Sequence, residues 1–310
     1  MAEKTLETDL SASGRKKIKS SGTDRAFVIC NTIFLSLFVA ITLYPILNTL
    51  AISFNDASDA LRGGIYLVPR KWTLQNYKTV LNKQNLMTGL WISVARTVLG
   101  TVLGLFITAL LAFMCSRPKY LLKKQMNIFW IITMYVNGGM IPIFLLYKDL
   151  GLTNSFWVYI VPGLTGAFNL MVLRSYMDTL PVSLEESAQL DGAGYMTIFF
   201  NITLPLCTPV LATVALFIAV GHWNSWFDTM LYNRMSPQYT TLQYELMKLL
   251  SSVTNQTASN ISSMEHNTAT VTPTSIRAAA SIITMLPIVC LYPFLQRYFV
   301  TGMTLGAVKE

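Results

Sequence analysis

The sequence predicts an all-α protein that is embedded in a membrane through six spanning helices. Of the 310 residues, 53% are hydrophobic and only 12% are charged, whereas a soluble domain typically has about 25% charged residues. Long apolar windows recur along the chain, and each can cross a hydrocarbon core of about 30 Å, which takes about 20 helical residues. The windows are Ala26–Asn55, Thr97–Ser116, Gln125–Tyr147, Leu150–Leu173, Thr203–Phe227 and Ala278–Gln296. Lysine and arginine gather beside them, as they do around membrane-spanning helices.

The N-terminal segment Met1–Asp24 is rich in Ser, Thr and Lys, and we expect a disordered tail because few apolar side chains are available to bury. The membrane domain then covers residues 25–310. Its first window continues for about 30 residues beyond Arg25 without a small-residue cleavage pattern, so we interpret it as a retained span and not as a signal peptide. Basic residues before this window predict a cytoplasmic N-terminus, and six spans place both termini on that side. They are Arg15, Lys16, Lys17, Lys19 and Arg25.

The second window begins directly after Arg96, which we expect near the outer end of the span, where its side chain can extend to the interface. Gly100 and Gly104 form a small-xxx-small pattern that favours close contact with another helix. Basic residues crowd the short segment that follows, which agrees with a cytoplasmic position. They are Arg117, Lys119, Lys123 and Lys124.

The third and fourth windows contain helix-breaking residues. Gly138, Gly139 and Pro142 interrupt the third, and Pro162 and Gly163 interrupt the fourth, with Gly166 close behind. Irregular backbone at membrane depth is tolerated where it faces protein or a water-filled cavity. These two windows therefore predict broken spans beside a pathway.

Between the fourth and fifth windows lies the segment Pro181–Pro205. Ser183 and Glu186 have the spacing of a capping box, and Gly192 is a natural left-handed helix terminator. Leu184 and Ala188 share one helix face, and a second apolar run follows at Ile198, Phe199 and Ile202. The pattern predicts a helix-turn-helix at the membrane surface, although a capped surface helix alone is common.

The full spacing of Pro181–Pro205 resembles the signature of membrane subunits of ATP-binding-cassette (ABC) importers, and we therefore call it the coupling segment. Glu186 and Ala188 are followed after three residues by Gly192, and after nine more by Ile202, Leu204 and Pro205. Ser187 stands where the family has its first alanine, and a small side chain still permits close approach. The resemblance implies a type I importer permease fold in which residues 183–192 form a coupling helix seated in a groove of an ATPase subunit. Glu185, Glu186 and Asp191 would offer charge to basic groups there, or would simply be solvated near the helix termini.

Two further resemblances concern the transported solute. The C-terminal run Gly302–Lys309 is similar to the tail of maltose-type sugar importers. Gly138–Pro142 and the stretch through Leu173 resemble the branch that handles complex or pectin-like oligosaccharides. The resemblance implies a complex with a second permease subunit, two ATPase subunits and an extracytoplasmic sugar-binding protein in a bacterial cell membrane.

A sugar pathway needs hydrogen-bonding amides and flat aromatic faces. Candidates are Tyr135, Asn137, Trp157, Tyr159, Asn169, Trp223 and Asn224. The last two resemble a Trp-Asn pair of sugar permeases. For each residue, helix packing or an interfacial aromatic belt is the alternative.

The outer loop Asp228–Arg277 is unusually long, and loops of such length are usually functional or disordered. Its Leu242, Leu246 and Leu249 have helical spacing and predict an amphipathic helix over Tyr239–Leu250, whereas Ser251–Ser275 is polar and expected to be irregular. The resemblance implies that this loop docks the binding protein, and a flexible linker is the alternative.

The chain contains no G-x4-G-K-[ST] phosphate loop, so we expect no cofactor on it, with ATP and Mg²⁺ bound by partner ATPases. Cys30, Cys115, Cys207 and Cys290 have no metal-site spacing and are expected to be apolar fillers. An ion-coupled secondary transporter is disfavoured because no window contains Asp or Glu. An integral-membrane enzyme is disfavoured because only two histidines, His222 and His266, are present. An ABC importer permease for a peptide, amino acid or ion is the nearer alternative.

Overall fold

The computed structural model describes residues 22–60, 62–259 and 272–307. Within these ranges the protein is helical, and its only extended pairing is an isolated bridge between Asn55 and Trp72. The expected disordered tail falls largely outside the described residues, as do residues 260–271 of the outer loop. The tail motif Gly302–Lys309 is described only as far as Ala307, where α15 ends.

The chain divides into two compact units, Met1–Asn48 and Thr49–Glu310. The described part of the first unit belongs to α2 (Gly22–Ser53), whose apolar side chains, such as Phe27 and Phe34, are exposed. The Thr32 hydroxyl donates to the Val28 carbonyl at 2.7 Å, so a polar side chain is satisfied within the helix itself. An exposed apolar helix with internally satisfied polar groups suits a lipid environment.

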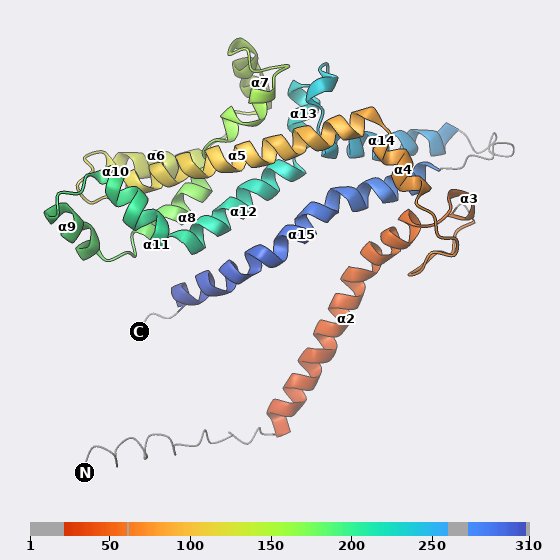
Figure 1. Cartoon of the computed structure of the whole chain (residues 1–310), viewed down its shortest axis with the longest axis horizontal. Helices are drawn as coiled ribbons and strands as arrows, with labels where there is room; N and C mark the ends of the chain where they lie inside the picture. The colour runs from red at the N-terminus through yellow and green to blue at the C-terminus, as the bar shows by residue number, and fades with distance from the viewer. Residues whose placement is uncertain (1–21, 61, 260–271, 308–310) are drawn as a thin grey trace. The chain divides into compact units, whose positions relative to one another are not determined.

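Helix α5 (Gln84–Ser116) is a long element of the second unit, and it contains no proline. It packs along α12 (Thr208–Asn224) and α8 (Ala167–Met177) (Figure 1). The predicted small-residue face is confirmed, because a Cβ atom at Gly100 would lie 2.3 Å from His222 Nε2 on α12, and one at Gly104 would lie 3.6 Å from the Leu164 carbonyl oxygen.

The predicted breaks in the third and fourth spans are confirmed. α6 (Lys123–Tyr135) and α7 (Met140–Asp149) meet at 116°, with Gly139 at φ 85° between them. The short helices η1 (Phe156–Tyr159) and η2 (Val161–Gly163) meet α8 at 43°.

A third helix break, which the sequence does not predict, lies near Cys207. There α10 (Tyr195–Ile198), the π-helical turn η3 (Phe199–Thr203) and α11 (Leu204–Leu206) lead into α12 at 83°. Pro205 and Pro209 flank this bend and remove two backbone donors from the helix.

Two described helices are long and apolar enough to cross a membrane alone, Thr23–Ser53 and Gln84–Ser116, and the three bent pairs raise the total to as many as five. The sixth window lies in α15 (Pro273–Ala307), whose apolar stretch Thr274–Cys290 is shorter. The membrane-helical fold is therefore confirmed, while the count of six spans stays a prediction.

The segment between α2 and α5 is ordered by side-chain hydrogen bonds around α3 (Ala57–Ala60) and α4 (Gln75–Leu81). Asn55 Oδ1 accepts from the backbone N–H groups of Arg70 and Lys71 at 2.8 and 2.9 Å. Asp59 accepts from Asn55 Nδ2 at 3.0 Å and forms an ion pair with Arg70 at 2.9 Å.

The long outer loop contains α13 (Phe227–Tyr232), η4 (Pro237–Tyr239) and α14 (Leu242–Ser259). The predicted amphipathic helix is confirmed in α14, where Leu242 and Leu246 are buried and Leu249 packs beside them. The prediction that the chain is irregular from Ser251 is wrong as far as Ser259, because α14 continues to that residue. Once a helix has nucleated, each further residue adds a hydrogen bond.

Candidate functional site

The site is built on α9 (Val182–Leu190), the first helix of the coupling segment. Its N-cap is Pro181, with φ −59°, and no side chain caps the first turn. The predicted capping box of Ser183 and Glu186 is therefore wrong. Proline supplies a helical φ and lacks the N–H that a helix start leaves unpaired, so the helix begins before Ser183.

The predicted left-handed terminator at Gly192 is confirmed. Gly192 has φ 84°. Its N–H donates to the Gln189 carbonyl at 3.0 Å, and the Ala193 N–H donates to the Ala188 carbonyl at 2.9 Å. These two bonds form a Schellman motif, which turns the chain sharply out of the helix. Nothing lies within 4 Å of a Cβ atom placed on Gly192, so the side facing away from this protein is open.

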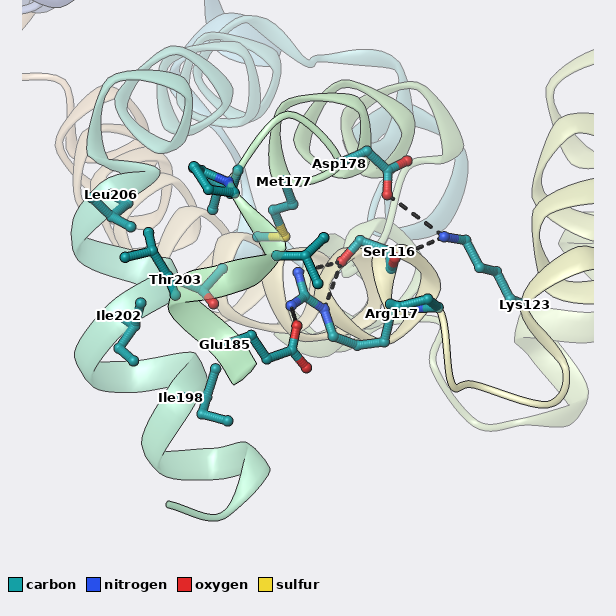
Figure 2. Close-up of a pocket in the computed structure, with 15 residues that line it drawn as sticks. Ser116, Arg117, Lys123, Met177, Asp178, Glu185, Ile198, Ile202, Thr203 and Leu206 are labelled. Atoms are coloured by element: carbon teal, nitrogen blue, oxygen red, sulfur yellow. Dashed lines mark hydrogen bonds and ion pairs between the residues drawn. The ribbon is translucent and has the colours of Figure 1, made fainter. Parts of the chain in front are cut away.

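An ion pair holds α9 against the end of α5. Arg117, directly after α5, contacts the Glu185 carboxylate, and both side chains are mostly buried at 14% and 12% exposure. Figure 2 shows them pointing toward each other. Gln189 Nε2 donates to Glu185 Oε1 at 3.2 Å, and Lys119 Nζ donates to Gln189 Oε1 at 3.4 Å. Glu185 is thus committed to this chain, whereas Glu186, Ser187 and Asp191 are exposed.

The second half of the coupling segment is fixed by apolar packing. Ile198 and Phe199 are buried, and Ala188 and Ile202 pack on the same cluster. The Phe199 ring lies 5.2 Å from the Phe113 ring of α5. The turn η3 is a π-helix, a rare geometry that is frequent at functional sites. Pro205 is exposed.

A cavity of 190 Å³ lies between the coupling segment and the basic turn that follows α5 (Figure 2). Lys123 Nζ donates to the Ser116 carbonyl at 2.7 Å and lies 3.7 Å from Asp178 Oδ1. The end of α5, the end of α8 and the coupling segment therefore share one polar network.

At the other end of the membrane region, the structure overturns the expectation for Arg96. Its side chain does not extend to an interface but is buried, at 3% exposure. Its guanidinium forms two bonds to Asp228 of α13, at 3.2 and 2.5 Å, and lies 4.4 Å from the centre of the Tyr159 ring. A buried arginine needs a counter-charge, and the sequence pattern missed Asp228 because it lies 132 residues away, just after the fifth window.

The predicted pathway residues lie on several elements. Tyr159 and Trp223 are buried in packing contacts: the Tyr159 hydroxyl donates to the Tyr239 carbonyl at 2.7 Å, and Trp223 Nε1 donates to the Thr284 carbonyl at 2.9 Å. The Asn224 amide accepts from Gln243 at 3.3 Å.

The remaining candidates lie beside the helix breaks. Asn137 accepts from the Gly139 N–H at 2.9 Å, Tyr135 and Trp157 are exposed, and Asn169 is half-buried on α8. A pathway role for these residues stays a prediction.

Within the described ranges, no group of three His, Cys, Asp or Glu side chains could hold a metal ion. Cys115 and Cys207 are buried thiols in the apolar core, whereas Cys30 and Cys290 are exposed.

Comparisons with known proteins agree on one family. The family model "Binding-protein-dependent transport system inner membrane component" matches residues 100–305. The chain is 35% identical over 285 residues to Protein LplC of Bacillus subtilis (strain 168), covering 92% of this chain and 95% of that protein. It is 33% identical over 276 residues to the polygalacturonan/rhamnogalacturonan transport system permease protein YtcP of the same organism, covering 89% and 96%.

Among solved structures, a chain of a bacterial ABC transporter involved in the import of the acidic polysaccharide alginate superposes with a TM-score of 0.80. It is 28% identical, and the match covers 90% of this chain and 99% of that chain.

Proposed function

Because the chain belongs to the family of binding-protein-dependent transport system inner membrane components, we propose that it moves an oligosaccharide inward across a bacterial cell membrane. It is a permease subunit of an ABC importer and not an enzyme. The observation that carries the proposal is the coupling segment, in which the signature residues Glu186 and Ala188 lie on a short helix that is followed by the left-handed Gly192.

The substrate class in this proposal is a complex oligosaccharide of the pectic type. The name of YtcP specifies polygalacturonan and rhamnogalacturonan, and the alginate importer handles another acidic polysaccharide. Sequence relatedness to both supports a carbohydrate over a peptide, amino acid or ion.

The complex in this proposal contains a second permease subunit, two ATPase subunits that bind ATP and Mg²⁺, and an extracytoplasmic binding protein. The exposed residues of the coupling helix, Glu186, Ser187, Asp191 and Gly192, face the ATPase. Closure of the ATPase pair on ATP then displaces a rigid helix and shifts the membrane helices between two packings. The outer loop Asp228–Arg277 docks the binding protein.

The proposed orientation has both termini in the cytoplasm, supported by the basic residues before α2 and after α5. Tyr120 lies in the second basic group. A cysteine at Tyr120, in a background without the four native cysteines, should react with an impermeant maleimide only after permeabilisation. Reaction in intact cells would reverse the topology.

The function is tested with the full complex in proteoliposomes that contain the binding protein. ATPase stimulation and uptake are measured with oligogalacturonides, rhamnogalacturonan fragments, maltodextrins, peptides and amino acids. We expect stimulation of at least fivefold by one carbohydrate class alone. Stimulation by a peptide or amino acid, and by no carbohydrate, overturns the proposed substrate class. Replacement of Ser251–Ser275 by a short Gly/Ser linker should remove this stimulation and leave basal ATPase activity intact.

A further inference from the structure

Helix α5 differs from the other apolar helices that the structure describes. α2 and α15 contain internal prolines, and the three remaining candidate spans are bent by 43°, 83° and 116°. α5 runs unbroken from Gln84 to Ser116 without proline. A continuous helix transmits a displacement along its axis, whereas a bend or proline kink can absorb it.

Two arginines of α5 and its C-cap are each paired with a carboxylate from a distant segment: Arg96 lies twelve residues after the start of the helix, and Arg117 follows its last residue. Arg117 pairs with Glu185 of α9, and Arg96 pairs with Asp228 of α13. The two arginines are about 31 Å apart along the helix, at 1.5 Å per residue. The polar contacts thus connect the coupling segment, at the C-terminal end of α5, and the outer loop, at Arg96 within α5, to one continuous helix.

Both pairs are supported by surrounding contacts. The Arg117 guanidinium lies 4.5 Å above the Phe113 ring and donates to Ser116 Oγ at 3.0 Å. The Arg96 guanidinium also donates to the Ser225 carbonyl at 3.4 Å and stacks on Tyr159 of η1. Arginine fixed from several sides follows its carboxylate partner with little freedom, because its planar group is pre-organised.

We propose that α5 is a connecting helix that carries the movement of the coupling helix to α13 and η1, with Arg117 and Arg96 as its two positioning residues. The proposal rests on the proposed function, because it requires α9 to be moved by an ATPase. The alternative route for the movement is through the helices next to the coupling segment in sequence. Both of these are bent: α8 meets η2 at 43°, and α10–α11 enter α12 at 83°.

The test measures the coupling ratio, defined as substrate transported per ATP hydrolysed, in proteoliposomes of the full complex. Glu185→Gln cuts the first link and Asp228→Asn cuts the second, and both amides preserve side-chain size. We expect each single variant to lower the ratio at least fivefold. Because the two links act in series, the double variant should fall no further than the worse single variant. Independent local effects at such distant sites would instead multiply.

Two additional variants separate the connecting role from a local one. Exchange of the first pair, Arg117→Glu with Glu185→Arg, should restore at least half of the wild-type ratio. Val102→Gly with Leu103→Gly leaves both ion pairs in place but softens the middle of α5, and should also lower the ratio. Val102 is exposed, so the matched control with alanine at both positions should keep the wild-type ratio.

Asp59→Asn serves as a control for the loss of an Asp–Arg pair away from α5, and should leave the ratio unchanged. Assembly is checked for every variant by size-exclusion chromatography. Multiplicative loss in the double variant, no rescue by charge exchange, or a normal ratio with two glycines each overturns the connecting role. If the wild-type complex hydrolyses ATP but transports no oligosaccharide, the proposed function fails instead.

Discussion

The two arginine sites on α5 use the same chemistry in different surroundings. Arg96 is 3% exposed at its side chain and forms two bonds to Asp228, whereas Arg117 is 14% exposed and shares Glu185 with Gln189. Arg96 Nε also lacks a hydrogen-bond partner within the described residues. The deeper burial of Arg96 indicates that its site depends more on the carboxylate than the Arg117 site does.

The largest contrast between the sites should be in stability. Asp228→Ala leaves Arg96 buried without a counter-charge, which costs about 3–5 kcal/mol. Glu185→Ala leaves Arg117 with the Ser116 hydroxyl as an acceptor and should cost about 1–2 kcal/mol. Thermal unfolding of the purified complex in detergent measures both losses. Equal losses would contradict the contrast drawn here, and Asp228→Asn provides the size-matched control.

The coupling helix itself can be perturbed without touching either pair. Gly192→Val introduces a β-branched side chain at φ 84°, in a conformation that costs on the order of 1–2 kcal/mol for such residues. We expect at least a tenfold loss of transport and of substrate-stimulated ATPase activity, because the corner no longer seats against the ATPase. Assembly in membranes should survive. A normal transport rate in this variant removes the coupling assignment.

The glycines of α5 offer a comparison along the same helix. Gly100→Ala forces a Cβ to within 2.3 Å of His222 Nε2, and overpacking of this kind costs about 1–3 kcal/mol. Gly104→Ala makes only ordinary contacts, at 3.6 Å and beyond, so stability should change by less than about 0.5 kcal/mol. Melting temperatures of the two variants, measured side by side, check the difference. An equal decrease would show that the α5–α12 contact is looser than described.

The smallest effect should come from the Asp59–Arg70 pair, which is partly exposed. The hydrogen bond from Asn55, followed by that from Arg70, lowers the pKa of Asp59 below its usual 3.8. A carboxyl group with a lowered folded-state pKa stabilises the protein above its unfolded-state pKa, and this contribution is lost as the pH falls through both values. When the pH is lowered from about 5 to about 3, about one unit on either side of the ordinary Asp pKa, wild type should therefore lose slightly more stability than Asp59→Asn does. Parallel pH profiles would contradict the shift.

Local signals in the sequence predict local structure well. Gly192 ends its helix as expected, and Gly139 marks the break of the third span, because a glycine with positive φ needs no distant partner. The helical spacing of Leu242 and Leu246 likewise predicts α14. The start of α9 was predicted wrongly because Pro181 and Ser183 are both acceptable starting residues, and the sequence does not rank them.

Long-range pairing could not be predicted in the same way. Nothing in the sequence near Arg96 indicates that its partner is Asp228. Likewise, nothing near Glu185 indicates which of the four basic residues after α5 is its partner, although the structure shows that it is Arg117. Both choices depend on how α5 packs against α12 and α8, which brings distant segments together. The sequence therefore predicts which elements exist, whereas the fold determines which charges meet.

The separation of Arg96 from Asp228 has a consequence for synthesis of the protein. With 132 residues between them and a synthesis rate of about 5–20 residues per second, Arg96 is synthesised about 7–26 s before Asp228. If the helix inserts before Asp228 is made, Arg96 has no counter-charge there, and extension of its side chain to the interface is the low-cost solution. Extension of the Arg96 side chain to the interface, which the finished structure does not show, thus suits the nascent chain. Ribosome-bound chains stalled before Asp228 should expose Arg96 to an arginine-specific reagent, and completed chains should protect it.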